Sequence, residues 1–151
     1  MNSDFRDLLQ IFVEESVEFL IVGGYAVIHY SQPRYTKDLD LWIRPESVNA
    51  ERLMKSFARF GLPMLGLEKE DFATPGTQLS IGVAPSEIDL LTTIPGLEFL
   101  GCWERKTLSA EEGILVPYVS KADLVIAKRT AGRHQDLADI EELERGEDSA
   151  R

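Results

Sequence analysis

The hydrophobic pattern of the first part of the chain predicts alternating helices and strands. Apolar residues recur at helical spacing near the N-terminus, at Phe5, Leu8, Leu9, Phe12 and Val13. Ser3 is the expected N-cap of this helix. The apolar run 19–22 predicts a buried strand, and Gly23-Gly24 predicts a tight turn after it. Residues 25–30 then predict a short helix that Pro33 stops, and residues 38–43 predict a second strand.

The middle of the chain repeats this alternation. Pro45 and Glu46 predict the start of a helix, and Gly61 predicts its end. The buried stripe of this helix would consist of Val48, Leu53, Phe57 and Phe60. Residues 61–76 predict a loop with little regular structure, and strands are predicted over 78–84 and 87–93, joined by a turn at Pro85-Ser86.

The last third predicts a hairpin followed by two helices. Residues 103–108 and 114–119 form the expected strands of the hairpin. Ser120 is the expected N-cap of a helix with Asp123 in its third position and Gly132 at its end. The spacing of Leu137, Ile140 and Leu143 predicts a final helix. With no repeat and no linker in between, we expect one domain over 1–145 and a polar, disordered tail over 146–151.

Composition and charge narrow the class of protein. A chain of 151 residues with 44% hydrophobic content is long enough to bury a core. Its net charge of −10 argues against broad, sequence-independent DNA binding, although a local basic strip would still be compatible with it. Cys102 is the single cysteine, which excludes an internal disulfide framework and agrees with a reducing cytoplasm. The sequence shows neither a signal peptide nor an apolar run of membrane-spanning length, so we expect a soluble cytoplasmic protein with no membrane partner.

Two aspartates on the second predicted strand are the first candidates for chemistry. Asp38 and Asp40 are two residues apart, so a strand would present both carboxylates on one face. Adjacent like charges repel, and Mg²⁺ is the natural counter-charge because it takes oxygen ligands of this kind. Alone, such a pair is more often a solvated strand end, and a Gly-Gly pair is more often only a turn. Their combination in one strand–turn–helix–strand unit favours a site.

A third carboxylate lies within an apolar run. Asp89 has Ile88 on one side and Leu90 on the other, and a charge in such a place is rare unless it is paired or bound to a metal. The alternative is an ion pair with a nearby arginine. Glu87 lies two residues earlier on the same predicted face and is the reserve candidate.

Several residues around the aspartates could contact phosphate. The helix that follows Gly23 and Gly24 would direct its unpaired N–H groups at an anion. Basic and hydroxyl side chains precede Asp38 in the spacer, and two lysines of the later helix could approach from across a cleft. They are Arg34, Thr36, Lys37, Lys121 and Lys128. For each of them a solvated position is the alternative, and the isolated His29 and His134 are expected to be structural or exposed.

In these motifs the sequence resembles the nucleotidyltransferase superfamily related to DNA polymerase beta. More narrowly, it resembles the minimal nucleotidyltransferases of bacterial and archaeal toxin–antitoxin systems. The resemblance rests on Val22, Gly23 and Gly24, thirteen spacer residues, and then Asp38-Leu39-Asp40-Leu41. It covers roughly residues 15–95, and Asp89 matches the third carboxylate that the family carries on a later strand.

The resemblance implies a fold and an activity. The fold would be α+β in two layers, with a mixed sheet of about 4–6 strands and helices packed on one face. The activity would be Mg-dependent transfer of a nucleoside monophosphate from an NTP to a protein, a tRNA or a small antibiotic, with release of pyrophosphate. Two Mg²⁺ ions would be held by Asp38, Asp40 and Asp89, the last of which would serve the acceptor hydroxyl. The nucleotide would contact Gly23, Gly24, Arg34, Thr36, Lys37, Lys121 and Lys128. An inactive module that binds a partner protein is the competing function.

Overall fold

A sheet of six strands forms the centre of the computed structural model, which describes residues 1–33, 35–63, 66–83 and 85–149, with the backbone alone for 146–149. The strands stand in the order β3-β4-β2-β1-β6-β5. They are β1 (Phe19–Val22), β2 (Leu39–Ile43), β3 (Gln78–Ile81), β4 (Ile88–Leu91), β5 (Thr107–Glu111) and β6 (Ile114–Tyr118). The sheet is mixed, because β2 pairs with β4 and β1 with β6 in parallel while the other neighbours are antiparallel. This confirms the predicted α+β fold with a mixed sheet.

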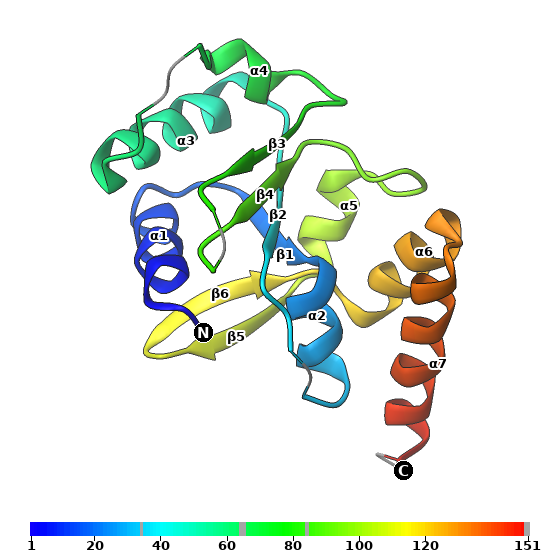
Figure 1. The fold of residues 1–151 in the computed structure, drawn as a ribbon. Coiled ribbons are helices and arrows are strands. Elements are labelled where there is room, and N and C mark those ends of the chain that lie inside the picture. Colours follow the sequence, from blue (N-terminus) through cyan, green and yellow to red (C-terminus); the bar gives the residue numbers. More distant parts are fainter. Residues whose placement is uncertain (34, 64–65, 84, 150–151) are drawn as a thin grey trace.

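Seven helices are described around the sheet (Figure 1). They are α1 (Ser3–Glu14), α2 (Gly23–Tyr30), α3 (Ser47–Phe60), α4 (Lys69–Ala73), α5 (Phe99–Glu104), α6 (Lys121–Ala131) and α7 (His134–Ser149). None of the helices in the described part of the chain is long and apolar enough to cross a membrane.

One face of the sheet is covered by α1 and α3. Phe12 of α1 packs on Phe19 of β1 with ring centroids 5.3 Å apart, and on Phe57 of α3 at 5.9 Å. Strand residues on this face, such as Leu41, are fully buried. Aromatic side chains of this size supply much of the hydrophobic free energy of the core.

The opposite face is covered only in part. Trp42 points to that face, because neighbouring residues of a strand point to opposite sides, and Phe99 of α5 packs edge-on against it at 5.2 Å. Helices α1 and α3 therefore pack on one face, as predicted, whereas α5 packs on the opposite face, which the prediction did not include. The part of this face that α5 leaves uncovered contains the acidic residues described below.

The two short helices α4 and α5 are the main corrections to the predicted elements. Helix α4 lies within the predicted loop 61–76 and buries Phe72, whose ring packs 5.9 Å from Phe57. Helix α5 includes Trp103, which was expected to begin a strand but instead stacks on Phe99 at 5.8 Å. Five- and six-residue helices are too short to show a helical period in the sequence.

Helix ends agree with the expected caps at several points. Gly61 ends α3 with φ +87°, and Ser120 caps α6 by accepting a hydrogen bond from the backbone N–H of Asp123 at 3.1 Å. Asn2, not Ser3, caps α1, since its side chain accepts from the backbone N–H of Asp4 at 2.7 Å. Val48 was predicted to be buried but is 49% exposed, and its neighbours Asn49 and Ala50 are the buried residues of this first turn of α3.

The ends of two strands and of the last helix also differ from their predicted positions. Strand β3 ends at Ile81, short of residue 84, which lies outside the described residues. Strand β4 covers 88–91 of the predicted 87–93. Helix α7 runs to residue 149, into the stretch 146–151 for which a tail was predicted, and residues 150–151 lie outside the described residues.

Candidate functional site

Asp40 and Asp89 lie directly opposite each other on the parallel strands β2 and β4. Asp38 lies just before β2, and Glu87 just before β4. One carboxylate oxygen from each of Asp38, Glu87 and Asp89 lies within 4.8 Å of the others. The structure thus brings Asp38 and Asp89 together with the reserve candidate, Glu87. Asp40 is not a member of this group of three and lies next to it as the register partner of Asp89.

The hydrophobic pattern of the two strands explains why these carboxylates share a face. Leu39 and Leu41 of β2 are fully buried, as is Leu90 of β4, and they point into the core beneath α1 and α3. Because side chains alternate along a strand, the acidic residues between them must point the other way. The backbone N–H of Leu39 donates to the carbonyl of Glu87 at 3.2 Å, which fixes the register at the acidic end of the pair.

Burial and mutual repulsion raise the pKa of Asp40. Burial, followed by the negative charges of Asp89 and Asp38, raises the pKa of Asp40 from 3.8 to about 7, against a small lowering by Lys128. The contact with Asp38 likewise raises the pKa of Glu87. Asp89 is held from one side by Ser80, whose hydroxyl donates to Oδ1 at 2.6 Å. The site therefore concentrates negative charge, and the charges of Lys128 and Lys37 offset it only in part, since the pKa values of Asp40 and Glu87 stay raised.

The donor set fits a hard divalent cation. Oδ1 of Asp38 is buried and has no hydrogen-bond partner among the described residues. An unpartnered buried carboxylate oxygen is costly, and a cation would remove that cost. Mg²⁺ takes oxygen ligands, so Asp38, Asp40, Asp89 and Glu87 offer suitable chemistry for it.

Gly23 brings the backbone against the acidic residues. Its φ is +66°, and a Cβ built at this position would overlap Oδ2 of Asp40. A Cβ on Gly24 would lie 2.5 Å from the hydroxyl of Thr36. At both positions the backbone lies too close to a neighbouring side chain to leave room for a Cβ. The diglycine pattern predicted such a close approach.

Helix α2 starts at Gly23 itself, so the predicted turn is the first turn of the helix. Its N-cap, Val22, provides no side-chain hydrogen bond, which leaves the first N–H groups of α2 available beside Asp40. An anion placed there would meet the positive end of the helix.

The predicted basic residues divide into three groups. Lys128 lines a cavity that Gly23 also lines, and its charge acts on Asp40. Lys37 is exposed, and its charge lowers the pKa of Glu87. Lys121 is the first residue of α6 and is not among the residues that line the cavity, and Arg34 lies outside the described residues.

A buried charge network holds Lys128. Its ammonium lies 3.0 Å from Asp139 and 3.4 Å from Asp136, two residues that are each 1% exposed. Arg133 also pairs with Asp136 at 2.7 Å. No local pattern predicts the burial of Asp136 and Asp139, because an acidic stretch in a final helix is typical of a solvated face.

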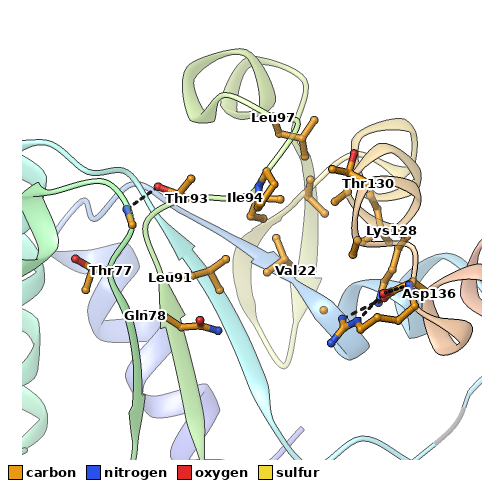
Figure 2. Close-up of a pocket in the computed structure, with 18 residues that line it drawn as sticks. Val22, Thr77, Gln78, Leu91, Thr93, Ile94, Leu97, Lys128, Thr130 and Asp136 are labelled. Atoms are coloured by element: carbon orange, nitrogen blue, oxygen red, sulfur yellow. Dashed lines mark hydrogen bonds and ion pairs between the residues drawn. The ribbon is translucent and has the colours of Figure 1, made fainter.

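The cavity lies between the β3–β4 pair and α6, with a volume of about 350 Å³. Figure 2 shows Gln78 and Leu91 on one side of it, Lys128 and Asp136 on the other, and Val22 between them. The cavity therefore begins beside the acidic residues and extends away from them along the sheet. The sequence did not predict this cavity, since its lining residues come from segments as far apart along the chain as Val22 and Asp136.

Comparison with solved structures shows which fold this is. The chain superposes on the lincosamide antibiotic adenylyltransferase LnuA in its lincomycin-bound form, with a TM-score of 0.60. The match covers 95% of this chain and 96% of that one, at 14% sequence identity. No protein-family model matches the sequence, and no curated protein matches it. The predicted nucleotidyltransferase fold is confirmed, while nothing in these comparisons bears on the toxin–antitoxin subtype.

Proposed function

We propose that this chain is a metal-dependent nucleotidyltransferase that transfers a nucleoside monophosphate from an NTP to an acceptor hydroxyl. The observation that carries the proposal is the convergence of Asp38, Asp40 and Asp89 beside the N-terminus of α2. Enzymes of this kind act mainly by positioning reactants and neutralising charge, for which such a cluster is suited.

Each part of the site then has a role. Asp38 and Asp40 would hold the metal ions for the triphosphate, and Asp89, supported by Glu87, would hold metal for the acceptor. When bound, two Mg²⁺ ions would supply charge neutralisation and make the acceptor hydroxyl easier to deprotonate. Gly23 and Gly24 let the N–H groups of α2 approach the phosphates, and Thr36 lies against Gly24. Lys128 contributes positive charge from the opposite wall, and we retain Arg34, Lys37 and Lys121 as further phosphate contacts.

The transfer itself is an in-line displacement. The acceptor oxygen forms a bond to the α-phosphorus, and the bond from that phosphorus to the bridging oxygen of the β-phosphate breaks. Pyrophosphate leaves with that electron pair, and the hydroxyl proton passes to a carboxylate oxygen of Asp89. No oxidant or reductant is needed.

The acceptor is a hydroxyl of a protein, an RNA or a small molecule. The structural neighbour is a lincosamide antibiotic adenylyltransferase, which makes an antibiotic one member of the small-molecule class. A toxin–antitoxin pair, in which the partner protein is modified or sequestered, is the biological setting that the resemblance suggests. Cys102 is free and buried, in keeping with action in the reducing cytoplasm.

Calorimetric titration of ATP, CTP, GTP and UTP, with and without Mg²⁺, tests the proposal. We expect at least one nucleotide to bind only with Mg²⁺ and to lose this binding in Asp38→Asn. Asp7→Asn is the matched control, because Asp7 lies on α1 with a side chain that is 62% exposed.

Incubation with labelled NTPs and total cell extract then shows whether label moves to protein, RNA or a small molecule. Protein that ignores every nucleotide would instead be an inactive module that binds a partner.

A further inference from the structure

The two walls of the cavity differ in charge. Among the described lining residues the charged ones are Lys128 of α6, Asp136 of α7 and Arg133 between the two helices. The opposite wall, formed by β3, β4 and the segment after β4, carries only hydroxyl, amide and apolar side chains among its described lining residues. They include Thr77, Gln78, Leu91, Thr93 and Ile94. The first wall carries the cations that a phosphate chain requires, although both also pair with Asp136, and the second wall carries none among its described lining residues.

The uncharged wall is continuous with Asp89. Ser80 pairs with Asp89, and Gln78 pairs with Leu91, along the antiparallel strands β3 and β4. Asp89 and Leu91 are two residues apart on one face, which is about 7 Å along a strand. Figure 2 shows Gln78 and Leu91 side by side on this wall. Asp89 is not itself a lining residue of the cavity, but a molecule that lies against Leu91 and extends along this face by about 7 Å reaches its carboxylate.

We propose that the uncharged wall binds the acceptor, and that this acceptor is a small organic molecule with an apolar body and a hydroxyl group. The inference rests on the proposed function, in which Asp89 serves the acceptor while α2 and Lys128 serve the phosphates. With its body on Leu91 and Ile94, the molecule presents its hydroxyl to Asp89. That oxygen bonds to the α-phosphorus, pyrophosphate leaves, and the proton passes to Asp89.

The size and chemistry of the cavity support this class of acceptor. A volume of about 350 Å³ lies in the range of small-molecule pockets and holds no folded protein or RNA element. Leu91 and Ile94 offer apolar contact, and Thr77, Gln78 and Thr93 offer hydrogen bonds that orient a polar end. An anionic acceptor would meet no cation on this wall among the described residues.

A pair of sugars that differ only in an apolar group tests the inference. Binding of p-nitrophenyl glucoside and of glucose to the whole chain is measured by saturation-transfer NMR, in the absence of NTP. We expect the aryl protons of the glucoside to receive saturation. Glucose should bind at least about tenfold more weakly than the glucoside, since it lacks the apolar ring. Equal binding of the two sugars would overturn the inference.

Gln78→Trp fills the uncharged wall and should weaken glucoside binding about tenfold or more. Leu108→Trp is the matched control, because it lies on β5, the other edge strand of the sheet, and is 51% exposed. Circular dichroism reports whether both variants fold. Ala131→Trp, at an exposed lining position of α6, blocks the same cavity should Gln78→Trp be unfolded. Glucoside binding that survives in the folded blocking variant overturns the inference.

The two proposals fail in different ways. Asp7→Asn should bind the glucoside as the parent does, because Asp7 lies on α1 and is not a lining residue of the cavity. If the parent fails to bind the glucoside, or binds it equally well after Gln78→Trp, while Mg-dependent NTP binding is intact, the acceptor site alone is rejected. Absence of Mg-dependent NTP binding rejects the transferase proposal and with it the role of the cavity as an acceptor site.

Discussion

Asp40 and Asp89 form a register pair across the parallel strands β2 and β4, so two carboxylates of like charge are held side by side by the backbone of the sheet. The backbone cannot relax to separate them, because the leucines on either side of Asp40 are buried in the core. The energetic consequences of this pair can be measured without knowing the substrate.

Asp40→Asn should stabilise the metal-free protein at high pH. The pKa of Asp40 is raised to about 7 in the folded state, by burial and then by Asp89. A carboxyl with a raised folded-state pKa favours folding below its unfolded pKa, and this contribution is lost as the pH rises through the folded pKa. In EDTA at pH 8 we expect the variant to be about 1–3 kcal/mol more stable than the parent, with a smaller difference at pH 5. Denaturant unfolding at both pH values measures this, and a pH-independent difference would contradict it.

Gly23→Ala should abolish nucleotide transfer and destabilise the fold more than left-handed strain alone explains. The new Cβ would overlap Oδ2 of Asp40, in addition to the strain of φ +66°. Gly113→Ala is the control, since Gly113 has φ +89° with nothing within 4 Å of a built Cβ. We expect about 1–2 kcal/mol for the control, which is the usual cost of this conformation, and clearly more for Gly23→Ala. Similar losses of stability in both variants would show that the contact with Asp40 has no cost.

Lys128→Met should cost about 3 kcal/mol of stability, because it leaves Asp136 and Asp139 buried without this cation. Arg129→Met is the control, since Arg129 is 62% exposed and pairs with Glu144 on the surface, where ion pairs contribute about 0–1 kcal/mol. Combining Lys128→Met with Asp139→Asn should restore part of the stability and leave NTP binding weak. Recovery of NTP binding together with stability would mean that Lys128 has a structural role only.

Mg²⁺ should raise the melting temperature of the parent protein, since a ligand that binds only the folded state stabilises it by mass action. The effect should disappear in Asp38→Asn and Asp89→Asn and become weaker in Glu87→Gln, whose carboxylate lies within 4.8 Å of both. Glu112→Gln is a suitable control, because its 50% exposed side chain belongs to the hairpin turn between β5 and β6. A full response in Glu87→Gln would remove Glu87 from the metal site.

Local patterns were enough to predict the residues that form the core of the site. The diglycine after an apolar run, the Asp-x-Asp spacing and a lone Asp89 among aliphatic residues each follow from short-range rules of helix and strand geometry. The alternation of leucine and aspartate even determined which face the carboxylates occupy, because a strand with one buried face has only one register.

Other features depended on contacts between distant segments, which no local pattern encodes. Glu87 joins the acidic residues because β2 pairs in parallel with β4. Asp136 and Asp139 are buried because α7 packs on α6, although their own surroundings in the sequence are acidic and polar. The cavity exists because α6 and the segment after β4 approach each other, with Thr130 beside Gly96. The sequence by itself thus determined the periodic elements and the carboxylates that they carry, whereas packing decided charge pairing, burial and the shape of the binding space.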